Sequence, residues 1–438
     1  MKKKGLSPEN DRRLFKIAGW SLKNTIRIVL CFSLLSIFLT CSKDDDQGNS
    51  ISKGKSEGFF NATFTEKTVY FDEKETNKDI ISIDENRNIY SFNSSSAKAK
   101  QLKKGDIILI HGKALGKANK VTEQGNAIVV EAVEAKLNEA IEDGTIEWST
   151  YCDFQPDMQL RAQIDDNYYS PIYKAGKIVN FEFEYGGLKY SIEMTMNKEN
   201  ANVKIEATKE AGAGAVKLKC AVEGKISALT SNNKIVYEKG KLKQFSNANN
   251  NLQGELTLSA IAAGSGNDFL DLKLPVVLGA YPVMVGPIPT VITLKMQFVV
   301  NAVVPLDGSA KLSTKFTYNS ETGFEYKGLD KPEIKGKIGK YTIDKKDTDT
   351  GASSAIGVNF GIGFPRLEVG MFGKLVVPWI QTAFLIGGDF TSYPACRTAK
   401  ASFIGGCGYD LNFLGFNNSG SMNLWNVEKE FLKVGDCK

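Results

Sequence analysis

The chain has 438 residues, with 55 basic and 50 acidic side chains, one histidine and seven cysteines. Residues 1–40 hold eight of the basic residues and two of the acidic ones, which leaves 47 basic and 48 acidic residues beyond them. A body without a concentrated excess of Lys and Arg argues against nucleic-acid binding, and a single histidine argues against His-rich zinc sites and histidine relays.

Residues 28–40, "IVLCFSLLSIFLT", are uncharged and mostly apolar, and a basic segment precedes them. A membrane-spanning helix needs about 20 apolar residues, so this run is short for a permanent anchor. A basic flank, a short apolar core and small residues before a cut are typical of a secretory signal peptide. We therefore expect residues 1–40 to be a cleaved signal peptide. An uncleaved membrane helix is the alternative.

The end of the apolar run, Leu39-Thr40-Cys41, resembles a bacterial lipobox, with Phe38 where that family usually has Leu. The resemblance implies that the thiol of Cys41 takes a diacylglycerol, that cleavage makes Cys41 the new N-terminus, and that its amine is acylated as well. Several acyl chains give firm attachment to a membrane, whereas one chain gives marginal attachment. The fatty acids would be of the palmitate kind.

The "SKDDD" after Cys41 resembles the export signal of Bacteroidota surface lipoproteins, matched at Lys43, Asp44 and Asp45. The resemblance implies a lipid-anchored protein on the exterior face of the outer membrane. The alternative is that the acidic run is only solvated chain. Residues 41–58 are polar apart from Ile51, which predicts a flexible tether.

Residues 59–150 predict a small β-barrel or sandwich unit with one short helix, because short β-like runs alternate with turn-forming segments. The helix is expected where Val133, Leu137, Ala140 and Ile141 recur at helical spacing, with Gly144 as its C-terminal stop. At roughly ten residues, such a helix depends on tertiary packing.

Residues 151–438 alternate with a period of two, which predicts a larger antiparallel β-sandwich-like domain. Gly186-Gly187 predicts a two-residue hairpin turn that pairs Tyr185 with Leu188. A second hairpin is expected between residues 292–304 and 310–318, around Asp307-Gly308. In "IGVNFGIGF", residues 356–364, one strand face consists largely of glycine, which predicts close approach of a neighbouring layer or a bend.

Residues 274–294 carry no charge. The segment is long enough to span a bilayer, but its four prolines forbid a regular helix. Two interpretations remain open: an extended crossover buried between sheets, or an exposed apolar lip that meets a partner, lipid or glycan.

The most site-like local cluster is "DDNYYSPIY", because sugars stack on aromatic rings and form hydrogen bonds with acids and amides. Its candidate ligand contacts are Asp165, Asp166, Asn167, Tyr168, Tyr169 and Tyr173. An Asp-Asn turn between two strands is the alternative. His111 is interpreted as structural, and Trp148, Trp379 and Trp425 as core residues.

Five cysteines follow Cys41, so two disulfides would leave one thiol unpaired. Cys396 and Cys407 flank ten residues, a spacing that a hairpin could close, and are the first candidate pair. The sequence leaves the connectivity of Cys152, Cys220 and Cys437 open.

The chain lacks G-x-S-x-G, Walker and H-E-x-x-H motifs, and no catalytic residue, metal ligand or cofactor is assigned. These observations favour a non-catalytic binding, adhesion or scaffold module at the cell surface, with a glycan or protein partner and the membrane reached through the lipid. One alternative is a glycoside hydrolase, which needs only two carboxylates. The other is a β protein that engages lipid through residues 274–294.

Overall fold

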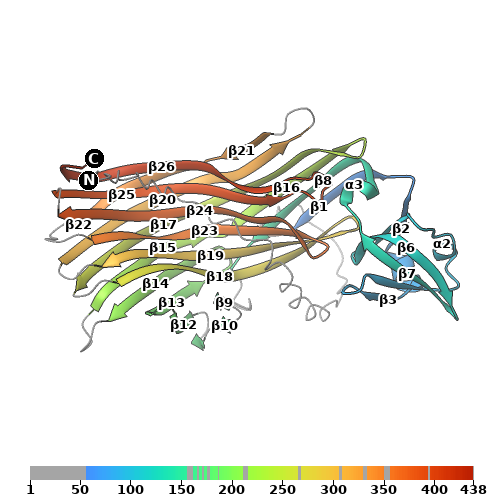
Figure 1. Ribbon diagram of the computed structural model, residues 1–438, viewed down its shortest axis with the longest axis horizontal. Coiled ribbons are helices and arrows are strands. Elements are labelled where there is room, and N and C mark those ends of the chain that lie inside the picture. The colour runs from blue at the N-terminus through green and yellow to red at the C-terminus, as the bar shows by residue number, and fades with distance from the viewer. Residues whose placement is uncertain are drawn as a thin grey trace, which may run out of the picture. The chain divides into compact units, whose positions relative to one another are not determined.

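A computed structural model describes residues 56–154, 161–164, 167–169, 172–174, 178–185, 187–210, 216–264, 268–304, 308–328, 333–349, 356–392 and 395–437 (Figure 1). Within this part of the chain nearly every element is a strand, which confirms the expected mainly-β class. The signal peptide, Cys41, Lys43, Asp44, Asp45 and most of the tether lie outside the described residues.

The strands form two large sheets and one small sheet. The 12-stranded sheet runs in the order β1-β8-β16-β17-β15-β14-β13-β12-β11, and β20 pairs with β17, β21 and β22. Its strands are β1 (Glu57–Phe64), β8 (Ile141–Cys152), β11 (Ile172–Lys174), β12 (Ile178–Tyr185), β13 (Leu188–Met196), β14 (Asn200–Glu210), β15 (Val216–Ser227), β16 (Leu229–Glu238), β17 (Lys241–Gly264), β20 (Gly308–Lys327), β21 (Glu333–Lys337) and β22 (Lys340–Asp349).

The 8-stranded sheet runs in the order β10-β9-β18-β19-β23-β24-β25-β26. Its strands are β9 (Arg161–Ile164), β10 (Asn167–Tyr169), β18 (Asp268–Val285), β19 (Ile288–Val304), β23 (Ile356–Met371), β24 (Lys374–Ser392), β25 (Ala395–Asp410) and β26 (Ser419–Gly435). Figure 1 shows the long strands of both sheets running alongside one another.

The large sheets pack face to face, because alternate side chains of each strand are apolar and share one buried cluster. Aromatic rings meet across the interface: the centroids of Phe316 in β20 and Phe384 in β24 lie 5.3 Å apart. Those of Tyr190 in β13 and Phe298 in β19 lie 6.0 Å apart. The space between the sheets is therefore a packed hydrophobic core.

The small sheet has the order β2-β5-β6-β7-β4-β3. It comprises β2 (Thr68–Phe71), β3 (Ile80–Asp84), β4 (Ile89–Asn93), β5 (Ile107–Ile110), β6 (Ala114–Gln124) and β7 (Ala127–Glu134), with the short helices α1 (Glu73–Asp79) and α2 (Ala97–Lys100). β1 and β8 pair with each other in the 12-stranded sheet, so the expected boundary at residue 150 falls inside β8.

The helix expected over Val133 to Ile141 is only four residues long, α3 (Leu137–Ala140). Val133 belongs to β7 and Ile141 begins β8. β-Branched residues around the helical pattern pair with neighbouring strands, and this pairing overrides the short helical periodicity. Gly144 lies within β8 at φ 152°, opposite Ala62 of β1, and does not terminate a helix.

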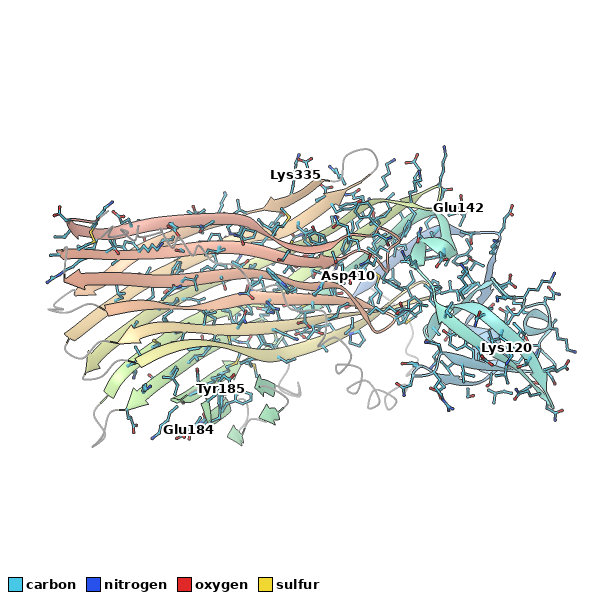
Figure 2. All side chains as sticks on the ribbon, viewed as in Figure 1. Lys120, Glu142, Glu184, Tyr185, Lys335 and Asp410 are labelled. Atoms are coloured by element: carbon cyan, nitrogen blue, oxygen red, sulfur yellow. A yellow bond between two sulfur atoms is a disulfide. The ribbon has the colours of Figure 1, made fainter. Side chains whose placement is uncertain are left out.

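The hairpin predicted at Gly186-Gly187 is confirmed, with Tyr185 opposite Leu188 and Glu184 opposite Lys189. Figure 2 shows Glu184 and Tyr185 together at the end of β12. The second expected hairpin is wrong: β19 pairs with β18 and β23, whereas β20 pairs with β17 in the other sheet. The chain changes sheets between them, and an alternating pattern carries no information about which neighbour a strand chooses.

The uncharged segment 274–294 forms parts of β18 and β19, which pair with each other. Its inward side chains are buried, among them Leu278, Val285 and Ile292. One face of the segment is thus buried, as the first interpretation expected in part, but in a β-hairpin and not in a crossover. Ala280, Pro282 and Gly286 on its other face are exposed. Met284, which is 46% exposed, is its large exposed apolar side chain.

A row of polar side chains interrupts the core beneath β8, β16, β17 and β20. Its members are buried and point inward: Thr150, Ser231, Asn233, Asn247, Asn249 and Thr322. Asn247 donates from Nδ2 to Asn233 Oδ1 at 2.8 Å, and Asn249 donates from Nδ2 to Asn247 Oδ1 at 3.0 Å. We call this set the buried amide row.

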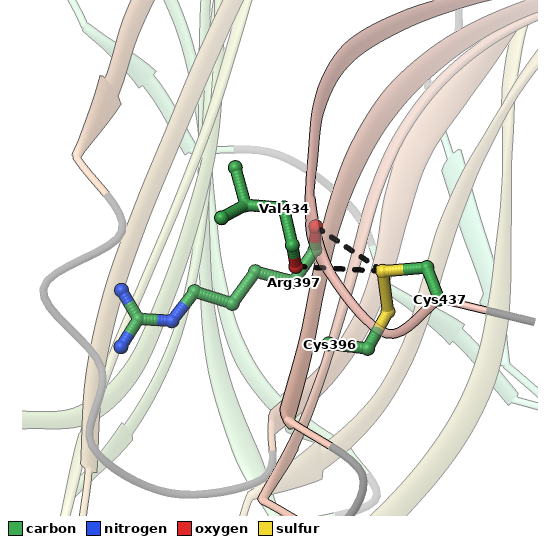
Figure 3. The surroundings of a disulfide bond; sticks show 4 residues. All are labelled: Cys396, Arg397, Val434 and Cys437. Carbon is green, nitrogen blue, oxygen red and sulfur yellow. Dashed lines mark hydrogen bonds between the residues drawn. A yellow bond between two sulfur atoms is a disulfide. The ribbon is translucent and has the colours of Figure 1, made fainter.

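Cys396 forms a disulfide with Cys437, with their Cα atoms 4.9 Å apart (Figure 3). The expected pair of Cys396 with Cys407 is therefore wrong. Both of those residues lie in β25, and its extended backbone carries them far apart, whereas β26 returns antiparallel and places Cys437 beside Cys396. Cys152, Cys220 and Cys407 are buried free thiols.

Candidate functional site: the β24 platform

The structure divides the cluster that the sequence singled out. Asn167, Tyr168 and Tyr169 form β10, which pairs with β9 in the 8-stranded sheet. Tyr173 lies in β11, which pairs with β12 in the 12-stranded sheet. Asp165 and Asp166 lie outside the described residues. Ile164 lies opposite Asn167 in the antiparallel β9–β10 pair, so Asp165 and Asp166 connect two neighbouring strands, as the alternative of a turn between two strands expects. Tyr173 belongs to the other sheet, so the six residues do not form one cluster.

A different group of chemically useful side chains lies on the outer face of the 8-stranded sheet. In β23, Leu367 is fully buried, so Arg366 beside it points away from the core. In β24, Ile380 is 3% exposed, so Trp379 and Gln381 on either side of it also point outward. Arg366 lies directly opposite Gln381 in the paired strands.

The β23 glycines allow β24 side chains to lie flat on that strand. A Cβ atom at Gly363 would lie 2.1 Å from Gln381 Nε2, and one at Gly361 would lie 2.4 Å from Leu385 Cδ2. Gln381 and Leu385 therefore occupy space that side chains of β23 would otherwise fill. The glycine face predicted in "IGVNFGIGF" permits close approach of the neighbouring strand's side chains.

The glycines of β25 receive the indole of Trp379 in the same way. A Cβ atom at Gly408 would lie 2.5 Å from Trp379 Nε1, and one at Gly406 would lie 3.1 Å from its six-membered ring. The indole thus rests on the backbone of β25 and stays partly exposed. Trp379, Gln381 and Leu385 together with Arg366 form a set that we call the β24 platform.

The guanidinium of Arg366 is held against this surface. Its Cζ lies 5.4 Å from the centroid of the Trp379 ring, and its Nη1 donates to Gln381 Oε1 at 2.9 Å. Stacking on an indole and a fixed amide acceptor together restrain the plane of the guanidinium. Burial lowers the pKa of Arg366, and the nearby Glu368 carboxylate acts in the opposite direction.

An ion pair borders the platform at β19. Lys295 Nζ lies 2.6 Å from Glu368 Oε1, and the two side chains are 18% and 14% exposed. The pair is therefore more shielded from water than ordinary surface pairs are, and water screens it less. Lys295 faces Arg366 across the β19–β23 pairing, so the pair and the platform are adjacent.

The outer face of the 12-stranded sheet has a different character. Lys and Glu side chains alternate across its strands, as in the pairing of Glu193 with Lys204 and of Lys204 with Glu223. A depression of about 640 Å³ opens there, lined by Glu193, Thr195, Asn202, Val203, Lys204, Glu223, Gly224, Lys225 and Glu255. Its carboxylates and ammonium groups largely neutralise one another, for example Lys315 with Glu255 at 2.5 Å.

The remaining reactive groups fit structural roles. The Nδ1 atom of His111 lies 2.8 Å from the Tyr70 hydroxyl, which gives the imidazole a partner within the small sheet. Burial raises the pKa of the Cys152, Cys220 and Cys407 thiols, to about 12 for Cys407. Across the described ranges, His, Cys, Asp and Glu form no group of three or more that could hold a metal ion.

Comparisons with known proteins give no relative from which a role for the site could be taken. No family model, no curated protein and no solved structure matches the chain. In the part of the chain that the structure describes, no helix has the length and apolar character to span a membrane.

Sequence reasoning missed the platform, because Trp379 was interpreted as a core residue. In "PWIQTAF" the buried residues are Ile380, Thr382 and Phe384, which places the tryptophan on the polar side of the alternation. This alternation within the strand could have shown from the sequence that Trp379 points outward. The glycine-rich runs in β23 and β25 were a second one, but only the strand order reveals that they flank β24.

Proposed function

We propose that the protein is a lipid-anchored surface lipoprotein that binds a glycan, without catalysis, on the β24 platform. The observation that carries this proposal is that Trp379 and Gln381 lie over glycines of the neighbouring strands and that both contact Arg366. Such a surface is open to an extended ligand lying across the sheet.

The chemistry of the platform matches that of a sugar. An indole supplies an apolar surface for the C–H face of a sugar ring, and amide and guanidinium groups form directional hydrogen bonds with hydroxyls. The groups are positioned before any ligand arrives, because each rests on a rigid strand and contacts another member of the set. Preorganisation of this kind reduces the entropic cost of binding.

Binding is favoured over hydrolysis by the carboxylates at the platform. Glycoside hydrolysis needs two carboxyl groups, one on each side of the scissile bond. Glu368, the acidic residue beside Arg366 on β23, is paired with Lys295. The lipid-engaging alternative loses support, because the apolar side chains of residues 274–294 are largely used in the core.

Glycan-array binding of the full chain, followed by an assay for released reducing sugar, tests the proposal. We expect binding without sugar release. Trp379→Ala should weaken binding about tenfold or more, since aromatic anchors dominate such interfaces. Glu193→Gln, in the depression of the other sheet, should leave binding unchanged and serves as the matched control. Absence of binding to any glycan, or equal effects of both substitutions, would contradict the proposal.

The proposed lipid anchor and surface location rest on Cys41 and the acidic run after it, and two substitutions test them. Cys41→Ser should abolish incorporation of [3H]palmitate, and normal incorporation would exclude the lipoprotein assignment. Replacing Lys43, Asp44 and Asp45 with alanine should keep the lipid but protect the protein from protease added to intact cells. Unchanged cleavage would exclude the export signal.

A further inference from the structure

Arg366 carries a charge that no side chain of the described residues balances. Its guanidinium has five N–H donors, and one of them is used, toward the neutral amide oxygen of Gln381. The other contact is with the Trp379 ring, and among the described residues Arg366 forms no ion pair. Among the described residues, the cation is held in place without an ion-pair partner.

The neighbouring charges do not compensate for it. Glu368 is the closest acidic residue on the same strand, and its carboxylate is bonded to Lys295 at 2.6 Å. Of these three groups, Lys295 and Glu368 form the ion pair, which leaves Arg366 without a carboxylate of its own. On the outer face of the 12-stranded sheet several cations have carboxylate partners, such as Lys219 with Glu206 at 2.9 Å.

A largely buried guanidinium with unused donors favours an anion with matching geometry. The planar fork of arginine binds carboxylate and sulfate groups through two parallel hydrogen bonds. The Trp379 ring and the Gln381 amide restrain the guanidinium, so less entropy is lost when such a group binds.

We infer that the glycan bound on the β24 platform is acidic and that Arg366 binds its oxyanion, a carboxylate or a sulfate on the sugar. The inference rests on the proposed function and adds the class of ligand. Trp379 receives the sugar ring, and Arg366 selects for the charged substituent.

Three polymers with one glucose backbone test the inference: dextran, carboxymethyl-dextran and dextran sulfate. Their affinity for the full chain is measured by calorimetry at 0.05 M and 0.5 M NaCl. We expect at least one charged polymer to bind tenfold or more tightly than dextran, with the preference reduced at the higher salt concentration. The two charged polymers distinguish a carboxylate from a sulfate.

Arg366→Gln should remove this preference, whereas Arg397→Gln, at an exposed arginine of the same sheet, should retain it. Should Arg366→Gln fail to fold, the preference of the unmodified chain and its salt dependence decide the matter. Equal affinity for all three polymers, or no binding to the charged ones, would overturn the inference and leave glycan binding to the array experiment. A charge preference that persists in Arg366→Gln, or disappears equally in Arg397→Gln, would also overturn it.

Discussion

The outer faces of the two large sheets meet their surroundings with different chemistry. On the 12-stranded sheet, long charged side chains pair across strands while staying about half exposed, as Lys204 does at 52% exposure. On the 8-stranded sheet, glycines of β23 and β25 allow Trp379, Gln381 and Leu385 to lie flat, and the Lys295–Glu368 pair is shielded. Both sheets bury the same kind of apolar side chains on their inner faces.

The difference between the two outer faces distinguishes a surface that only needs to stay soluble from one that has further features to explain. Exposed Lys–Glu pairs on the outer face keep a sheet soluble, and each pair contributes little to the free energy of unfolding. Glycine in a strand interior weakens the strand, so a face with glycines beneath flat side chains needs another explanation. The glycan binding that we propose supplies one. Four predictions test this contrast and follow in order of decreasing magnitude.

Gly361→Ala should destabilise the protein by about 3 kcal/mol. The new Cβ atom would lie 2.1 Å from the carbonyl oxygen of Phe384, a backbone atom that cannot rotate away. Ser259→Ala, on the outer side of β17, should change the free energy of unfolding by less than about 0.5 kcal/mol. Urea unfolding of both variants measures the contrast. Equal losses in the free energy of unfolding would show that the two outer faces do not differ in their response to substitution.

Lys295→Met should cost about 2 kcal/mol, because it leaves the shielded Glu368 carboxylate without its partner. Lys204→Met should cost less than about 0.5 kcal/mol, because its partners lie 3.9 Å away and Lys204 itself is 52% exposed. Adding Glu368→Leu to Lys295→Met should recover part of the loss. Failure of that second change to recover any stability would argue that Lys295 acts through packing and not through charge.

The inner faces should respond alike to alkaline pH. Burial raises the pKa of the Cys407 thiol from 9.0 to about 12 and also raises that of Cys220 in the other sheet. A raised folded-state pKa means full stability below pH 9 and a loss as the pH rises from 9 toward 12. At pH 10 the loss is about 1.4 kcal/mol for Cys407.

Urea unfolding of the unmodified chain and of Cys407→Ala, at pH 8 and pH 10, tests this expectation. The difference between the two pH values should be smaller in the variant, and Cys220→Ala should behave in the same way. An identical pH dependence in all three proteins would mean that neither thiol is shielded.

Glu206→Gln should give the smallest effect, about 0.5 kcal/mol at low salt, because its bond with Lys219 lies on an exposed face. In 1 M NaCl the effect should vanish, since screening then acts over about 3 Å. Glu368→Gln should keep its cost at both salt concentrations. Matched unfolding curves at 0.05 M and 1 M NaCl measure the two responses.

Local patterns in the sequence predicted the features that depend on residues close together in the chain. Alternation predicted the β class, and Gly186-Gly187 predicted the register that places Tyr185 opposite Leu188. Strand partners are long-range choices: β19 and β20 are consecutive yet enter different sheets, and Cys396 bonds with Cys437 across β25 and β26. The platform depends on three strands being adjacent, so the roles of Trp379 and its supporting glycines emerged only with the strand order.

The buried amide row has a consequence for how these strands find their alignment. Moving β16 by two residues along β17 would keep every inward side chain inward, so apolar burial alone cannot exclude the shift. The shift in one direction would place Asn233 opposite Phe245 instead of Asn247, and its amide would lose its partner inside the core. The hydrogen bonds between the asparagines therefore specify the register of β16 on β17. A core of apolar side chains alone would tolerate the shifted register.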